Sequence, residues 1–211
     1  MAHRLAGVRV AVEGAIPPES CIVVMNHQSV LDIPLGIYLI PGPYPLIPTR
    51  DRYKRGIPGI SPLVRLARYP CVSQRRTARR AELQALAEAA SQVARGERSF
   101  LIFPEGHRTR DGNIGRFMRN GLRMVLGDAA RPIYCIVVDG IAQSRTFADA
   151  MTRFAGMTVR LRVIGPFALD DPGSIDPFID MLRDRMVAAL AQLRGTSDEP
   201  ASFTSGPVAA P

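Results

Sequence analysis

The sequence predicts an α/β fold, a single domain in which helices flank a mostly parallel or mixed central sheet. Three continuous apolar runs are typical of strands buried on both faces: residues 21–25, 100–103 and 133–138. A further strand is predicted at 159–164, and helical apolar patterns lie between and after these runs. Strands that alternate with helices favour a sheet covered on both faces.

The other elements are predicted from local signals. The clearest helix is expected at 81–95, because one face is apolar and Gly96 follows it: Leu83, Leu86, Ala87, Ala90 and Val93. A second helix is expected at 117–126, and a last one with Asp176 as its cap and Pro177 in its first turn. Residues 8–12 alternate like a half-buried strand, and short strands are expected at 46–47 and 71–72.

Composition indicates one ordered domain followed by a tail. The chain has 211 residues and is 46% hydrophobic, which suffices for one sizeable core. We expect this domain to span residues 1–194. Residues 195–211 consist largely of small residues and proline without an apolar period, which predicts a disordered tail.

The charge points to an anionic partner. The net charge is +8, and all basic residues except Lys54 are arginine. A guanidinium group donates two parallel hydrogen bonds, so this composition suits phosphate. Nucleic acid, anionic lipid and a phosphorylated small molecule all remain compatible with it.

The sequence carries no strong targeting signal. Cys21, Cys71 and Cys135 each lie in or beside an apolar run, which predicts buried free thiols and a cytoplasmic compartment. Residues 1–9 lack the apolar core of a signal peptide. No run reaches the ~20 apolar residues that span a bilayer, because prolines and glycines interrupt the best candidate at 33–48.

His27 and Asp32 follow the predicted strand at 21–25 and are separated by four residues. In one continuous helix they would point about 140° apart. If His27 precedes the helix and Asp32 lies inside it, the ring can fold back onto the carboxylate. Asp32 would then fix the tautomer and leave the other ring nitrogen free as a base. The alternative is a histidine that is satisfied by the start of a helix.

Residues 105–108 follow the strand at 100–103 and combine a carboxylate, a glycine and an arginine with His107 between them. Backbone N–H groups of such a turn, together with Arg108, can hold a phosphate. The alternative is a charged surface turn in which Glu105 and Arg108 pair with each other, which would contribute little.

Together the two segments resemble the glycerolipid acyltransferases. The order Asn26, His27, four residues, Asp32, followed by Phe-Pro-Glu-Gly-x-Arg at 103–108, is most similar to the 1-acylglycerol-3-phosphate (lysophosphatidate) acyltransferases. Segments 117–121 and 132–138 agree with this resemblance, which covers roughly residues 7–193. It implies a glycerol-phosphate acyltransferase-like fold.

The resemblance also implies the chemistry. His27 would deprotonate the acceptor hydroxyl, which attacks an acyl thioester directly, and Asp32 would orient His27. Glu105, Gly106 and Arg108 would bind the acceptor, a lysophospholipid. The donor would be acyl-CoA or acyl carrier protein, with no other cofactor and no metal.

The sequence departs from the family pattern in several places. His107 replaces a common threonine, and Cys135 replaces a proline. Gln74 aligns with an arginine that helps to bind the acceptor, while Arg75 lies one step along. We assign Arg75 to the acceptor site. The apolar helices that usually precede the first strand are not seen. Either the start codon is assigned too late, or the protein is peripheral, which is the expectation that we adopt: it would lie on the cytoplasmic face of the membrane, held by apolar residues at 38–48 and by arginines.

Other functions are weaker interpretations. Nucleic-acid binding lacks support, because aromatic residues are 6% of the chain and no binding motif occurs. A hydrolase with Ser29 as nucleophile lacks the usual Gly-x-Ser-x-Gly motif. The same chemistry on another acceptor is the main alternative: a lyso-ornithine lipid, another lysophospholipid or glycerol-3-phosphate.

Overall fold

The protein has a six-stranded mixed sheet with strand order β1-β2-β8-β7-β3-β6. The computed structural model describes residues 2–5, 8–50, 53, 60–72, 80–127, 131–143 and 156–195. The pairs β2/β8, β7/β3 and β3/β6 are parallel, whereas β1/β2 and β7/β8 are antiparallel. The predicted α/β fold with a mixed central sheet is confirmed.

The strands lie close to their predicted positions. Their bounds are β1 (Ala2–Leu5), β2 (Val8–Glu13), β3 (Ile22–Met25), β4 (Thr49–Arg50), β5 (Cys71–Val72), β6 (Phe100–Ile102), β7 (Ile133–Asp139) and β8 (Thr158–Phe167). Strands β4 and β5 form a separate parallel pair. Leu46, in the predicted strand at 46–47, forms only an isolated bridge to Phe100.

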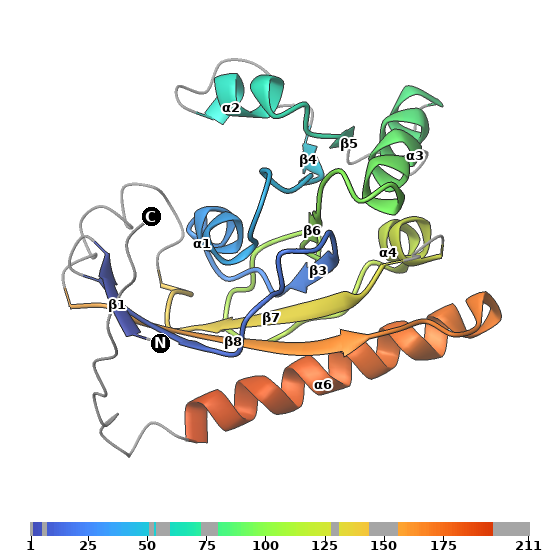
Figure 1. Cartoon of the computed structure of the whole chain (residues 1–211). Helices are drawn as coiled ribbons and strands as arrows, with labels where there is room; N and C mark the ends of the chain where they lie inside the picture. Colours follow the sequence, from blue (N-terminus) through green and yellow to red (C-terminus); the bar gives the residue numbers. More distant parts are fainter. Residues whose placement is uncertain are drawn as a thin grey trace.

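The helices are α1 (Asp32–Leu39), α2 (Ile60–Leu66), α3 (Arg80–Ala94), α4 (Arg119–Leu126), the short 3-10 helix η2 (Pro172–Ser174) and α6 (Ile175–Gly195). Figure 1 shows α6 lying along the face of β7 and β8, with α1 on the other side of the sheet. No helix of the described ranges is long and apolar enough to cross a membrane. The predicted tail beyond Gly195 lies outside the described residues.

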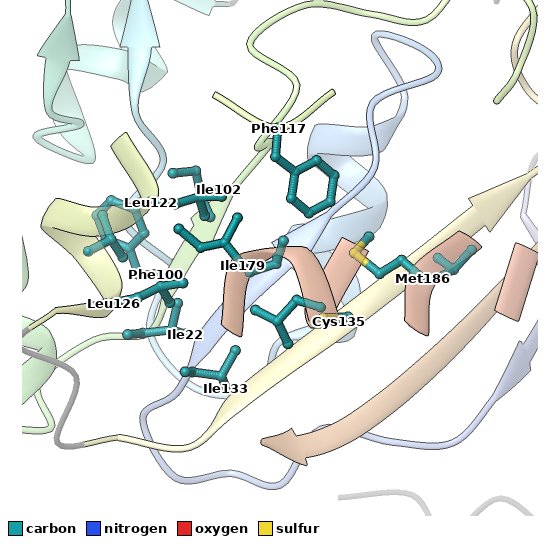
Figure 2. Packing of buried hydrophobic residues seen from close by; sticks show 14 of the residues in the cluster. Ile22, Phe100, Ile102, Phe117, Leu122, Leu126, Ile133, Cys135, Ile179 and Met186 are labelled. Carbon is teal, nitrogen blue, oxygen red and sulfur yellow. The ribbon is translucent and has the colours of Figure 1, made fainter. Parts of the chain in front are cut away.

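The central strands are buried on both faces, as their continuous apolar runs predict. Ile22 and Val24 of β3 face a core shared with α3, α4 and α6, part of which is shown in Figure 2. Val23 and Met25 face the opposite core, against which α1 packs. All three cysteines are buried free thiols, which confirms that prediction.

The predicted cap of the last helix is wrong. The chain turns into η2 first, and the Asp171 carboxylate accepts the Gly173 N–H at 2.9 Å as its cap. Asp176 lies in the first turn of α6, where its carboxylate accepts two hydrogen bonds from Arg123. The aspartate therefore joins α4 to α6 instead of capping the helix.

Candidate active site

At the end of strand β3, the side chain of Asn26 takes the place of the backbone hydrogen bonds to β7. The Asn26 amide nitrogen donates to the Val138 carbonyl oxygen at 2.9 Å, and its oxygen accepts the Val138 N–H at 2.8 Å. The side chain thus satisfies the backbone of β7 at a position where the main chain of β3 leaves the sheet. The next residue, His27, is therefore placed at the carboxyl end of a central strand, where α/β proteins bind ligands.

The His27 ring folds back onto Asp32. His27 Nδ1 lies 2.7 Å from Asp32 Oδ2, and Asp32 is the first residue of α1. The histidine side chain is 17% exposed and the aspartate is completely buried. His27 Nε2 has no hydrogen-bond partner within the described residues, so the pair has the arrangement that the sequence predicts for an oriented base.

Asp32 receives several donors on one oxygen. Besides His27, the N–H groups of Gln28 and Ser29 donate to Oδ2, at 2.6 and 2.7 Å. Oδ1 is buried and has no partner in the described part of the chain. Burial raises the pKa of the Asp32 carboxyl, while the hydrogen bonds from His27 and the two N–H groups oppose this shift. The contacts fix the carboxylate, and with it the ring.

Glu105 joins the two motifs that the sequence predicts to act together. Its carboxylate is buried, and Oε1 accepts the His27 N–H at 3.0 Å while Oε2 accepts the Gly115 N–H at 3.2 Å. Burial raises the pKa of this carboxyl, and the bond from His27 opposes that shift. With both oxygens occupied, Glu105 is better suited to positioning the histidine segment than to direct contact with a ligand.

We expect Glu105→Ala to lower the free energy of unfolding by about 2–4 kcal/mol, because it leaves two N–H groups without their acceptor. Glu105→Gln keeps one acceptor oxygen and should lose about half as much. Urea denaturation measures both changes. Equal stability of the wild type and Glu105→Ala would show that water satisfies these N–H groups instead.

Two more contacts hold the strand ends together. The His27 ring stacks on Phe103, with centroids 4.3 Å apart and an angle of 25° between the rings. The Thr109 N–H donates to the His27 carbonyl oxygen at 2.8 Å. Because β3 and β6 are parallel neighbours, residues 78 positions apart in the sequence meet at the same edge.

The segment from Gly106 to Arg108, which we call the acceptor loop after the role that the sequence predicts for it, lies between Glu105 and Thr109, the two residues that bind the His27 backbone. Gly106 has a φ of 69°, a left-handed conformation that favours glycine, and it is exposed. His107 is exposed and Arg108 is partly buried. Arg50, at the end of β4, donates from Nη2 to the Gly106 carbonyl oxygen at 3.0 Å. Arg50 was not among the predicted site residues, because the short strand that it ends, Thr49–Arg50, was predicted at 46–47 instead.

A polar network that the sequence did not predict holds the far end of this segment. Gln28 Nε2 donates to the Gly112 carbonyl oxygen at 2.8 Å and lies 3.3 Å from Asp139 Oδ1. Arg194, near the end of α6, donates to the same two acceptors at 2.8 and 3.0 Å. The last helix therefore supports the residue that follows His27.

The remaining predicted position cannot be placed. Gln74 and Arg75 both lie outside the described residues, so the assignment of Arg75 to the acceptor site stays a prediction. The residues that are described bring an oriented imidazole next to a glycine turn and two arginines. Such a site can remove a proton from a hydroxyl group on a molecule that also carries a phosphate.

Comparison with known proteins identifies similar sequences. A family model described as acyltransferase matches residues 8–139. Human 1-acyl-sn-glycerol-3-phosphate acyltransferase alpha is 26% identical over 194 residues, which are 90% of this chain and 66% of the human protein. The bacterial 1-acyl-sn-glycerol-3-phosphate acyltransferase of Borreliella burgdorferi is 31% identical over 127 residues, covering 58% of this chain and 48% of that protein.

A solved structure shares the fold. The crystal structure of the 1-acyl-sn-glycerophosphate (LPA) acyltransferase PlsC from Thermotoga maritima superposes with a TM-score of 0.64 at 22% sequence identity. The match covers 93% of this chain and 74% of that one. This chain spans slightly less than two thirds of the human relative and about half of the Borreliella one.

Proposed function

Because this chain belongs to the acyltransferase family, whose model matches residues 8–139, we propose that it transfers a fatty acyl group from a thioester to 1-acylglycerol-3-phosphate. The product would be phosphatidate. The observation that carries the proposal is the 2.7 Å contact between His27 Nδ1 and the buried Asp32 carboxylate. It leaves Nε2 as the nitrogen that faces substrate.

In the proposed reaction the acceptor hydroxyl attacks the thioester carbonyl carbon while His27 Nε2 takes its proton. The tetrahedral intermediate then collapses, the carbon–sulfur bond breaks, and an ester and a thiolate form. The imidazolium returns the proton to the thiolate, so the histidine ends as it began. A thiol with a pKa near ~8.5 is a good leaving group, so no acyl-enzyme is needed. Asp32 stabilises the transient imidazolium.

The acceptor is bound through its phosphate in this proposal. Arg108 supplies a guanidinium group, and Gly106 leaves backbone groups accessible. Arg50 is added to the predicted set because it already contacts the acceptor loop at Gly106. Arg75 remains assigned to the same phosphate from the sequence alone.

The donor is proposed to be acyl-CoA or acyl carrier protein, and the reaction balances without another cofactor. We further propose that the protein binds the cytoplasmic face of the membrane as a peripheral protein. Exposed apolar side chains support this: Tyr38 and Tyr44, which are 58% and 60% exposed, and Leu66. The substrate lipid would then enter from the surface on which the protein rests.

The proposal is tested by incubating purified full-length protein with acyl-CoA and a panel of acceptors, and following thiol release and lipid products. The panel contains lysophosphatidate, glycerol-3-phosphate, lyso-ornithine lipid and other lysophospholipids. Phosphatidate as the main product is the expected result. Preference for another acceptor would keep the chemistry and change the substrate, and no transfer to any acceptor would reject the function.

Arg108→Ala is expected to raise the KM for lysophosphatidate about tenfold, because it removes a charge-assisted hydrogen bond to the phosphate. Transfer to monoacylglycerol, which has no phosphate, should change much less. Arg110→Ala is the matched control, since Arg110 is an exposed arginine two residues further along. An unchanged KM in Arg108→Ala would remove Arg108 from the acceptor site.

A further inference from the structure

A second basic site lies beside the acceptor loop and is not used in the proposed reaction. It is a pocket of about 220 Å³ between the segment that leads into α4 and the middle of α6. Its lining combines three arginines with one acid and two apolar residues: Arg116, Arg119, Arg183, Asp180, Phe117 and Ile179. Phe117 and Ile179 belong to the core, as Figure 2 shows.

Some guanidinium N–H groups of this arginine pocket remain available to bind an anion. Arg119 donates to both oxygens of Asp180, at 2.7 and 2.9 Å, and its Nη1 also lies 3.4 Å from Asp176 Oδ1, so Arg119 and the one acid of the lining are already paired. Arg183 uses Nε to bind the Gly115 carbonyl oxygen at 2.9 Å, and its Nη1 lies 3.5 Å from Asp184 Oδ1 at the exposed surface. Arg116 is exposed and has no partner among the residues that the structure describes. Arg116 and the remaining N–H groups of Arg183 can supply the paired N–H bonds that a phosphate accepts.

The same segment is tied to the active site. Gly115, whose carbonyl oxygen binds Arg183, donates its N–H to Glu105, which holds His27. The Met118 N–H donates to the Pro104 carbonyl oxygen at 2.7 Å. Residues 115–118 therefore run alongside residues 104–106. Three hydrogen bonds, which pass through Glu105 and Gly115, therefore link the His27 backbone to Arg183 of the pocket.

We propose that the arginine pocket binds the phosphate at the end of the pantetheine arm of the acyl donor. This inference rests on the proposed acyltransferase function. The arm joins thioester to phosphate through two amide units, a length close to that of four extended residues, or roughly 14 Å. A donor anchored at Arg116 and Arg183 can therefore present its thioester near His27. CoA and acyl carrier protein share this phosphate, so the pocket serves either donor.

The proposal is tested on the full-length protein with two acyl donors, one with and one without the phosphate. The ratio of kcat/KM for acyl-CoA to that for acyl-pantetheine, which has no phosphate, is measured in the wild type and in Arg116→Ala. We expect the ratio to exceed one in the wild type and to fall about fivefold to tenfold in the variant. Arg185→Ala removes the same charge from an exposed position of α6 outside the pocket and should leave the ratio unchanged.

Titration of CoA by calorimetry gives a second readout that does not depend on activity. CoA should bind the wild type more tightly than pantetheine does, and Arg116→Ala should weaken CoA alone. If CoA binding changes in this way but the protein acylates no lipid, the proposed function is rejected and the assignment of the pocket to the donor phosphate is kept.

Two results would overturn the pocket assignment. An unchanged donor ratio together with unchanged CoA binding in Arg116→Ala would show that the pocket binds neither donor. A higher KM for lysophosphatidate with an unchanged donor ratio would show that it holds the acceptor's phosphate instead.

Discussion

Replacement of His27 by alanine is expected to reduce acyl transfer by at least about a thousandfold, the largest effect of any single change in this chain. The imidazole lies at the end of β3, and its Nε2 has no hydrogen-bond partner within the described residues. Without it the acceptor hydroxyl must lose its proton to water, while the acceptor loop and Arg108 remain in place. The KM for lysophosphatidate should therefore change far less than kcat.

The fold should survive this substitution. Glu105 binds the His27 backbone N–H and Thr109 binds its carbonyl oxygen, and alanine retains both groups. Circular dichroism and the melting temperature provide the control, and loss of the ring stacking on Phe103 accounts for a modest decrease. A correctly folded His27→Ala variant that keeps more than a tenth of the activity would exclude His27 as the base.

Ser29→Ala tests the hydrolase alternative in the same assay. Ser29 is completely buried, and its Oγ accepts the Leu31 N–H, which does not suit a nucleophile. An acyl group found on Ser29 by mass spectrometry would support a covalent mechanism and reject direct attack.

The sequence predicts those parts of the fold in which the local pattern and the burial coincide. The runs at 21–25, 100–103 and 133–138 become β3, β6 and β7, because strands buried on both faces must be apolar throughout. Helix α2 and strand β1 were missed, since both are short and carry no periodic pattern. Asp176 looked like a cap, but the tertiary contact with Arg123 decides its role.

In the candidate site, too, local sequence patterns predict short-range contacts but not long-range ones. The contact between His27 and Asp32 spans five residues, so local spacing could predict it. The contact between His27 and Glu105 spans 78 residues and depends on which strands are neighbours, which spacing does not reveal. Arg50 reaches the acceptor loop across 56 residues for the same reason. Long-range partners therefore require the sheet order, which the sequence did not predict.

Asp32→Asn is expected to lower kcat about a hundredfold or more while the protein stays folded. The amide oxygen can take the place of Oδ2, which accepts the Gln28 and Ser29 N–H groups, and the NH₂ group then occupies the position of Oδ1. The contact with His27 loses its negative charge. Two charges about 4 Å apart interact by about 4 kcal/mol at an effective dielectric constant near 20, and each 1.4 kcal/mol is about tenfold in rate.

The pH dependence of stability separates this role from a purely structural one. Burial raises the pKa of Asp32 above the value of about 3.9 in an unfolded chain, so the folded state keeps the proton to a higher pH than the unfolded chain does. The stability that it contributes is present below pH ~4 and is lost as the pH rises through the raised pKa. Asparagine does not ionise. The melting temperature of the variant relative to the wild type should therefore rise as the pH increases from about 4 through the raised pKa of Asp32.

In Asp32→Asn the activity should thus fall, while the stability relative to the wild type should rise as the pH increases above about 4. That combination is expected if the buried carboxylate is kept for the imidazolium that forms on His27, and not for the fold. A variant with near wild-type kcat would reject the orienting role. A variant that loses stability relative to the wild type on going from about pH 4 to 7 would show that the ionised carboxylate stabilises the fold, and its inactivity would then say little about catalysis.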